Sequence, residues 1–404
     1  MAEQRTRKEL GEWKDISIVN LIDSLVEYAH GNHASDIHID PSEKKVRVRL
    51  RIDGVLEELC VFPKDIHPEI ISRIKILASL RTDEHQAPQD GRFRISLKDT
   101  LPVDVRVSIV PTFFGENAVL RLLSDKAENL SLEMLGLSET DYAKLKKAAE
   151  KSSGMILATG PTGSGKTTTL YTILKMLNTK EVSIITIEDP IEYALDGIEQ
   201  IQVNPRSSLT FANGLRSILR QDPNIIMVGE IRDTETAGIA VNTALTGHLL
   251  LSTLHTSDAA TTLPRLLDMK IEPFLVASTV NVAIGQRLVR KICASCKKEK
   301  KLSEHELKSF TQTLAGKGFD EKTVYYYGAG CDECNGTGYR GRVGIYEVLE
   351  VDHDIREAII DHASASTIRE IAVKAGMKTM VEDGLSKAKA GITTLEEVLR
   401  VGHE

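Results

Sequence analysis

The sequence predicts an α/β protein with two domains, a small α+β domain followed by a larger domain whose sheet is mostly parallel. Residues 1–125 combine a helical segment with strands that alternate polar and apolar side chains, as in an antiparallel sheet with one solvated face. Residues 132–404 alternate short apolar segments with helical ones, as in a parallel sheet covered by helices on both faces. The polar, charged stretch 126–131 is the expected linker.

The elements of the first domain follow from local patterns. Apolar residues recur at helical spacing in 16–30. Strict alternation predicts half-buried strands at 46–52 and 103–109, each with arginine on one face. Asp53 and Gly54 predict a hairpin turn after the first of these strands.

The second domain should contain buried strands and a helical C-terminal part. Four short apolar segments are the expected strands: 155–158, 183–187, 225–228 and 249–253. Residues 346–404 are mostly helical in pattern and acidic, and Thr393-x-x-Glu396 is a predicted capping box within them.

Composition limits the class of protein. The chain has 404 residues, 41% of them hydrophobic, which is enough for two or three domains with real cores. Its net charge of −7 provides no global basic field that would attract nucleic acid. No apolar run is long enough to span a membrane, and the N-terminal residues do not resemble a signal peptide. We therefore expect a cytoplasmic protein with reduced thiols.

The most informative motif is an octapeptide that fits the phosphate-binding pattern of Gly, four residues, Gly-Lys-Thr. A buried strand leads into it and a helical stretch, 167–177, follows, which is the context that such loops require. Lys166 would reach the β- and γ-phosphates of ATP, and the Thr167 hydroxyl would bind Mg²⁺. The alternative is a glycine-rich turn that binds nothing. The expected nucleotide contacts in this loop are Gly160, Pro161, Thr162, Gly163, Ser164, Gly165, Lys166, Thr167 and Thr168.

Acidic residues follow the next two predicted strands. Glu188, Asp189 and Glu192 follow one strand, and Glu230 follows the other. Because ligands bind at the carboxyl ends of strands in α/β sheets, both clusters should face Lys166. One carboxylate would hold Mg²⁺ and another would deprotonate the attacking water, whereas the alternative for any single residue is an acidic loop position.

Two histidines bracket the last of the four strands. His248 precedes it and His255 follows it. A histidine near a γ-phosphate could sense that group, and the alternative is a strand-end histidine with a structural role only.

Four of the five cysteines occur as two Cys-x-x-Cys pairs, Cys293 with Cys296 and Cys331 with Cys334. In a cytosolic protein this pattern predicts a Zn²⁺ site with four thiolates and no open coordination position, hence a structural role. The 34 residues between the pairs would form an inserted subdomain within 286–345. The alternatives are reduced structural cysteines or a redox pair. Cys60 lies in a strand-like segment and should be buried.

The motifs of both domains resemble those of the secretion ATPase superfamily, the motors of type II secretion and type IV pilus assembly. The matching segments are GPTGSGKTTTLY (160–171), TIEDPIEY (186–193), LRQDPNIIMVGEIRDTETA (219–237), TGHLLLSTLHT (246–256), ASDIHIDP (34–41), RLRIDGVL (49–56), PQDGR (88–92) and VDVRVS (103–108). The four cysteines are similar to those of the assembly-type motors. The resemblance implies a PAS-like first domain, a RecA-like ATPase domain and a homohexamer, with ATP between the two domains and against a neighbouring subunit.

The resemblance also implies roles for individual residues. Glu192 matches the general base, and Glu230 matches the acid that holds Mg²⁺ through water. Arg106 and Arg121 match arginines that the first domain presents to the nucleotide. The matching pair near subunit contacts is Arg216 and Arg220. The sequence departs from the family pattern at 82–86, where members usually have an Ala-Glu-Lys-Arg-like stretch. We therefore assign no interface role to residues 82–86.

We therefore expect an ATP-hydrolysing motor that assembles a type IV pilus or a type II secretion pseudopilus and is bound to the inner membrane through a platform protein. The extra N-terminal docking domain of many assembly motors is not expected in this chain, so docking is unassigned. One alternative is a DNA-uptake pilus motor. A second is a nucleic-acid translocase, which the acidic net charge disfavours. A third is a zinc-containing adaptor that binds ATP but does not hydrolyse it. Basic residues at 287–301 are expected on a solvated surface, with acidic phospholipid or an acidic partner as the next interpretation.

Overall fold

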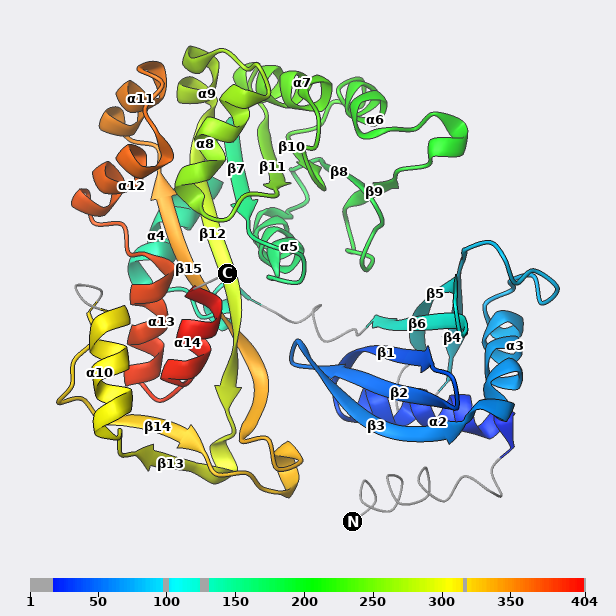
Figure 1. Cartoon of the computed structure of the whole chain (residues 1–404). Helices are drawn as coiled ribbons and strands as arrows, with labels where there is room; N and C mark the ends of the chain where they lie inside the picture. The colour runs from blue at the N-terminus through cyan, green and yellow to red at the C-terminus, as the bar shows by residue number, and fades with distance from the viewer. Residues whose placement is uncertain (1–16, 97–101, 124–130, 315–317, 403–404) are drawn as a thin grey trace. The chain divides into compact units, whose positions relative to one another are not determined.

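The computed structural model describes residues 17–96, 102–123, 131–314 and 318–402, and the chain divides into two compact units, Met1–Ala127 and Glu128–Glu404 (Figure 1). All but the last residue of the expected linker, 126–131, lie outside the described residues. Each unit has its own sheet and hydrophobic core.

The first unit is a six-stranded antiparallel sheet in the order β3-β2-β1-β6-β5-β4. Helices α2 (Ile18–Gly31) and α3 (His67–Leu77) contribute their apolar side chains to one core cluster with the strands. Those strands are β1 (Ala34–Pro41), β2 (Lys45–Ile52), β3 (Val55–Pro63), β4 (Gln89–Ile95), β5 (Val103–Thr112) and β6 (Gly115–Leu123). The expected α+β architecture is therefore present.

Alternation in the sequence decides which face of this sheet is buried. Along β2, Val46, Val48 and Leu50 are buried while the intervening arginines are on the other face. Asp53 and Gly54 have φ values of 49° and 88°, the backbone that a tight two-residue hairpin turn needs. Both the strand and the turn are as predicted.

The second unit contains a seven-stranded sheet in the order β15-β12-β7-β11-β10-β8-β9. All neighbouring pairs are parallel except β12 with β15. The strands are β7 (Gly154–Thr159), β8 (Ile184–Glu188), β9 (Glu199–Gln202), β10 (Ile225–Val228), β11 (Leu249–Leu254), β12 (Val280–Ile292) and β15 (Tyr339–Glu350). The four predicted strands agree with the observed ones to within one residue at either end.

Helices cover both faces of this sheet, because alternate strand residues belong to different cores. Met155 and Leu157 of β7 belong to one cluster, whereas Ile156 and Ala158 belong to the other. The first cluster includes residues of α6 (Phe211–Ile218), α7 (Thr234–Leu245), α8 (Ala259–Asp268), α9 (Pro273–Thr279), α11 (His353–Ile360) and α12 (Ala365–Lys374). The second includes residues of α4 (Glu139–Ala149) and α5 (Lys166–Leu177).

A separate small layer lies at the far end of the β12–β15 ribbon (Figure 1). It contains a two-stranded antiparallel sheet that shares an apolar cluster with neighbouring helices. Its elements are β13 (Lys297–Lys300), β14 (Tyr325–Gly328), α10 (Glu304–Thr313), α13 (Met380–Lys389) and α14 (Leu395–Gly402). The residues between the two cysteine pairs therefore pack on the C-terminal helices.

The predicted capping box at Thr393 is wrong by one residue. Thr394 accepts the backbone N–H of Glu397 at 3.3 Å, which makes Thr394 the cap of α14. Thr393 instead donates its hydroxyl to the Arg290 carbonyl oxygen at 2.7 Å. This hydrogen bond links β12 to the C-terminal segment.

In the described part of the chain, no helix has both the length and the apolar character that crossing a bilayer requires.

Two helical glycines provide a paired test of this packing. A Cβ at Gly214 of α6 would lie 1.9 Å from Cδ1 of the buried Ile187, whereas a Cβ at Gly238 of α7 would meet no atom within 4 Å. We expect Gly214→Ala to destabilise the unit by about 1–3 kcal/mol through overpacking. Gly238→Ala should stabilise it by about 0.5–1 kcal/mol by restricting the unfolded chain. Thermal unfolding of both variants checks this, and melting temperatures that shift in the same direction would contradict it.

Candidate functional site

The phosphate-loop motif connects a fully buried strand, β7, to α5. Gly163 and Gly165 have φ values of 80° and 89°, a backbone conformation that side chains with a Cβ rarely adopt. Gly165 is the N-cap of α5, so the backbone N–H groups of the first helical turn are directed toward the loop. A helix N-terminus of this kind favours an anion through both its N–H groups and its dipole.

The loop packs against β12, which the sequence reasoning did not identify. A Cβ at Gly160 would lie 2.4 Å from the Gln286 carbonyl oxygen, so only glycine permits this approach. Gln286 is fully buried and its Nε2 donates to the Ser164 carbonyl oxygen at 2.8 Å. The parallel register of Thr159 with Gly285 places the phosphate loop beside Gln286 of β12. Register within a sheet carries no local sequence signal.

Lys166 is held inside the loop. Its Nζ donates to the carbonyl oxygens of Gly160 at 2.8 Å and Pro161 at 3.0 Å, and only 9% of the residue is exposed. Burial lowers the pKa of Lys166; the negative charge of Glu230 opposes this shift and the positive charge of Arg287 adds to it. The ammonium group is therefore held by two carbonyl oxygens of the loop and feels charges of both signs.

The acidic clusters lie at the same edge of the sheet as the loop. The strand order β7-β11-β10-β8 brings the carboxyl ends of these parallel strands together. Glu230 follows β10 and is 8% exposed. It forms an ion pair with Arg232, and its Oε2 lies 2.9 Å from Nε2 of His255. His255 thus joins β11 to the acid that follows β10.

The acids after β8 have different surroundings. Glu188 is 2% exposed, and its carboxylate accepts hydrogen bonds from Thr186 at 2.6 Å, Gln200 at 3.1 Å and the Tyr171 hydroxyl. Burial raises the pKa of Glu188, and these hydrogen bonds oppose the shift. This geometry favours a structural role for Glu188 over the predicted nucleotide contact. Asp189 is exposed, and Glu192 is half-buried.

His248 lies at the start of β11, away from the phosphate loop, and its predicted role stays a prediction. Its backbone oxygen accepts from Gly154 N–H at 3.1 Å, at the start of β7, and its Nδ1 lies 3.2 Å from the Thr243 carbonyl oxygen. The phosphate loop follows the other end of β7. A strand thus separates His248 from any bound phosphate.

The predicted pair of Arg216 and Arg220 lies on the surface. On and just after α6, Arg216 pairs with Glu235 at 2.7 Å, and Arg220 donates to the Arg216 carbonyl oxygen at 2.9 Å. Both arginines are exposed, as a contact with another subunit would require.

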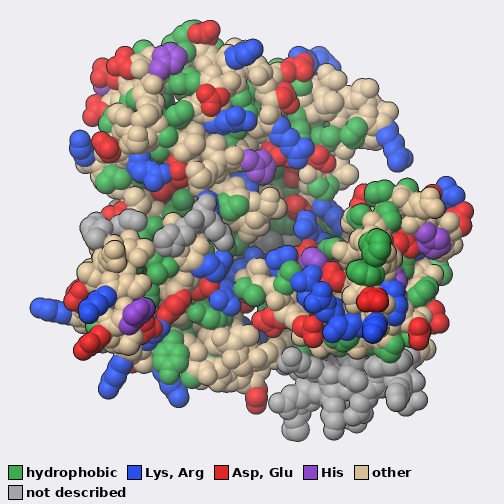
Figure 2. Space-filling model, viewed as in Figure 1, with side chains coloured by type: hydrophobic (Ala, Val, Ile, Leu, Met, Phe, Trp, Pro, Cys, Tyr) green, Lys and Arg blue, Asp and Glu red, His purple; other side chains and the backbone are tan. Residues whose placement is uncertain are grey.

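In the first unit, one cross-strand row spans five strands and contains four arginines. It runs through Arg92, Arg106, Arg121, Asp36 and Arg51. Asp36 is 4% exposed and lies 3.0 Å from Nε of Arg121 and 3.6 Å from Nε of Arg51. Lys and Arg side chains gather on this unit in Figure 2. The row therefore forms a cationic patch on the sheet, and Asp36 is the acidic residue within it.

The basic residues at 287–301 lie only partly on a solvated surface. Arg287 is 6% exposed, and Arg290 pairs with the buried Glu397 at 2.8 Å while its guanidinium lies 4.1 Å from the centre of the Tyr339 ring. Lys300 is half-buried and pairs with Glu306 at 3.0 Å. The exposed cations of this segment are Lys291, Lys297, Lys298 and Lys301.

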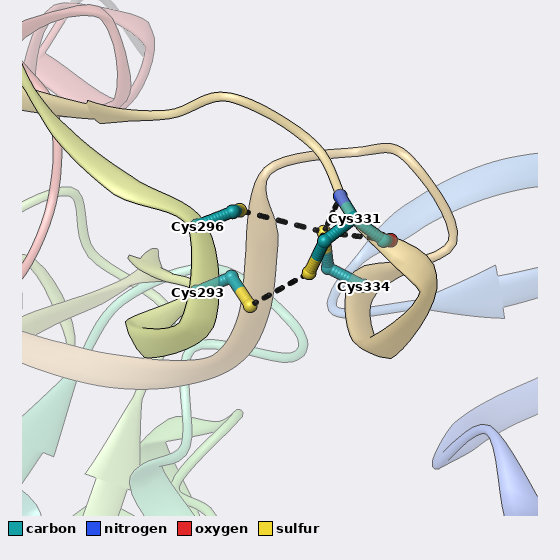
Figure 3. Close-up of side chains that lie close together, drawn as sticks. All are labelled: Cys293, Cys296, Cys331 and Cys334. Atoms are coloured by element: carbon teal, nitrogen blue, oxygen red, sulfur yellow. Dashed lines mark hydrogen bonds between the residues drawn. The ribbon is translucent and has the colours of Figure 1, made fainter.

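The four paired cysteines converge at the end of the β12–β15 ribbon (Figure 3). Their sulfur atoms all lie within 4.8 Å of one another. The Sγ–Sγ distances are 3.8 Å for Cys293–Cys331, 3.8 Å for Cys296–Cys334 and 3.7 Å for Cys331–Cys334. A tetrahedral ion with Zn–S bonds of about 2.3 Å has edges of about 3.8 Å. The arrangement therefore fits Zn²⁺, and these distances are far too long for disulfide bonds.

Backbone N–H groups prepare one of these thiols for metal binding. The N–H groups of Cys331 and Gly338 each donate to Sγ of Cys334 at 3.2 Å. Although burial raises the pKa of the Cys334 thiol, these bonds bring it down to about 7. By contrast, burial raises the pKa of the half-buried Cys60 thiol to about 12. Cys60 lies on β3 of the first unit and is not one of the four clustered cysteines, so it is a suitable internal control.

The chain is similar to known proteins over nearly its whole length. The model of the type II/IV secretion system protein family matches residues 12–400. The type II secretion system ATPase E of Vibrio cholerae is 44% identical over 406 residues, which cover 100% of this chain and 79% of that protein. The type IV pilus assembly ATPase PilB of Thermus thermophilus is 47% identical over 382 residues, which cover 94% of this chain and 42% of that protein. This chain thus spans less than half the length of that relative.

A solved structure shares the fold. The crystal structure of the pilus retraction motor PilT with bound ADP has a TM-score of 0.62 and 27% sequence identity, covering 94% of this chain and 96% of that one. The expected RecA-like fold of the second unit is thereby confirmed.

The cysteine geometry predicts one Zn²⁺ per chain. Cys331→Ser should lose the metal and loosen residues 290–345, because a closed thiolate site supplies local folding energy. Loosening should extend to α13 and α14, which share an apolar cluster with this subdomain. Elemental analysis and hydrogen exchange measure both effects, with Cys60→Ser as a control that keeps its metal. Metal-free wild-type protein with four freely labelled thiols would refute this expectation.

Proposed function

The chain belongs to the type II/IV secretion system protein family, and on that premise we propose that it is an ATP-hydrolysing motor for assembly of a type IV pilus or a type II secretion pseudopilus. The observation that carries this proposal is the placement of Lys166, Glu230 and the Glu192 segment at one edge of the sheet. Phosphoryl transfer depends on positioning and charge neutralisation, for which these groups are suited.

Each residue has a separate task in this proposal. The N–H groups of the loop and Lys166 bind the triphosphate. The Thr167 hydroxyl and Glu230 offer hard oxygen ligands of the kind Mg²⁺ prefers, Glu230 acting through water. When bound, the metal neutralises charge on the phosphate oxygens. Glu192 accepts the proton of the attacking water. His255 and Arg232 hold Glu230 in place through its two carboxylate oxygens.

The row of arginines on the first unit gives that unit a part in hydrolysis. Arg106 and Arg121 supply positive charge to the phosphates, and arginine suits this because its planar group binds two oxygens at once. Work is then delivered by motion of the two units during each ATP cycle. The supporting observation is that the side chain of Arg121 is 55% exposed despite its pair with Asp36.

Assembly and partners complete the proposal. The motor works as a homohexamer, in which Arg216 and Arg220 lie near a neighbouring subunit. It acts on an inner-membrane platform protein of the secretion or pilus machine at the cytoplasmic face, and the exposed lysines near the cysteine site meet that partner or acidic phospholipid. Stable binding of nucleic acid is not expected, because the chain is acidic.

Replacing Glu192 and Glu230 by glutamine should impair different steps of the ATP cycle. Glu192→Gln should still bind ATP but lower kcat by about 10²- to 10⁴-fold, the usual contribution of a general base. Glu230→Gln should weaken Mg²⁺-dependent binding as well, since this carboxylate serves the metal. Nucleotide affinity and kcat measure the difference, with the exposed Glu199→Gln as a control. Hydrolysis by Glu192→Gln within about threefold of wild type would exclude it as the base.

Arg121→Ala should lower kcat by about 10-fold or more without loss of zinc or of the folded core, because this guanidinium acts on phosphate charge. The matched control is Arg94→Ala, which removes another exposed arginine that pairs with a carboxylate, Asp104, in the same sheet. Steady-state hydrolysis and zinc content give the comparison. If the two variants have equal kcat for ATP hydrolysis, the arginines of the first unit take no part in the mechanism.

A further inference from the structure

The side chain of Gln200, on β9, links the end of β8 to the middle of the loop that carries Glu192. Its Oε1 accepts the backbone N–H of Leu195 at 2.7 Å. Its Nε2 lies 3.2 Å from the Tyr193 carbonyl oxygen and 3.1 Å from Oε1 of Glu188. An amide has two N–H donors and one acceptor oxygen. The Gln200 side chain can therefore form hydrogen bonds with Leu195, Tyr193 and Glu188 at the same time.

The same network reaches the phosphate-loop helix. Tyr171 lies on α5, as does Lys166. Its hydroxyl donates to Oε2 of Glu188, and its oxygen accepts the backbone N–H of Glu192 and lies 3.3 Å from Nε2 of Gln200. The helix that begins at the phosphate site is therefore linked through one hydroxyl to the Glu188 carboxylate and to the backbone of Glu192.

Burial makes this network rigid. Tyr171 is fully buried and Glu188 is 2% exposed. Burial raises the pKa of Tyr171, so its hydroxyl keeps its proton and remains a donor. Unsatisfied polar groups at such a depth are costly, and each member thus restrains the others.

Regular structure alone does not hold the loop. The residues between β8 and β9, 189–198, contain neither a helix nor a strand. β9 has four residues, lies at the edge of the sheet and pairs only with β8. The position of Glu192 relative to α5 consequently depends on side-chain contacts, and Gln200 supplies two of them to the loop, at Tyr193 and Leu195.

We propose that Gln200 is a positioning residue, which fixes the Glu192 loop relative to the phosphate-loop helix through Glu188 and Tyr171. The inference rests on the proposed function, in which Glu192 is the general base. It assigns Glu188 to the support of that base and not to the nucleotide. A displacement of about 1 Å at a catalytic group can cost about 100-fold in rate, so loss of this support should be visible in turnover.

The direct test removes the amide in the full-length protein. Gln200→Leu keeps the approximate size of the side chain but deletes its polar contacts. We expect kcat for ATP to fall about 10- to 100-fold, with KM within about threefold of wild type. Gln202→Leu is the matched control, because Gln202 is an exposed glutamine on the same strand, and it should behave as wild type. Wild-type kcat in Gln200→Leu would overturn the proposal.

A double-mutant cycle separates positioning from general stability. If Gln200 acts through Glu192, then Gln200→Leu should cause little further loss of kcat in a Glu192→Gln background. Equal fold-losses in both backgrounds would show a merely structural effect and overturn the inference. Should Gln200→Leu not fold, Tyr171→Phe removes a single hydroxyl of the same network and should produce the same split between kcat and KM.

The outcomes for the two proposals are distinct. An inactive Glu192→Gln combined with a fully active Gln200→Leu and Tyr171→Phe would overturn the positioning role alone. A Glu192→Gln variant that turns over ATP like wild type would overturn both, since there would then be no base to position.

Discussion

Strand β12 is the element on which both chemical sites of the second unit depend. Up to Gly285 it is a strand of the main sheet, beside β7, and from there to Ile292 it pairs only with β15. At the point of departure, Gln286 supports the phosphate loop, and immediately beyond its other end Cys293 begins the thiolate cluster. The two sites are therefore separated by roughly 20 Å of one continuous strand.

The C-terminal helices keep this ribbon in place. Arg290 on β12 forms an ion pair with Glu397 of α14. Burial raises the pKa of Glu397, but the hydrogen bonds from Arg400 and Arg290 and the charge of Arg290 outweigh this effect and bring the pKa to about 2. Val289 packs against Val401 in a small apolar cluster. The C-terminal segment thus serves as the support of the cysteine subdomain, and the two should be regarded as one structural layer.

Much of the fold could be predicted because its signals are local. Apolar runs located the four central strands, and the glycine pattern located the phosphate loop between the first of them and α5. Strand β9 was missed because Glu199–Gln202 is polar, as an edge strand can be. The buried state of Arg287 and the pairs of Arg290 and Lys300 could not be predicted, since their partners come from other elements of the chain. His248 and His255 differ because they lie at opposite ends of β11, and only His255 follows the carboxyl end that faces the phosphate loop.

The row of arginines on the first unit has a thermodynamic consequence of its own. Arg92, Arg106 and Arg121 are cross-strand neighbours, and like charges in that relation repel one another, while Asp36 and Asp104 offset part of the charge. The sheet therefore stores electrostatic repulsion that any anion on this face would relieve. Because a ligand stabilises the state that binds it, the melting of this unit should itself report the occupancy of the row, apart from any hydrolysis.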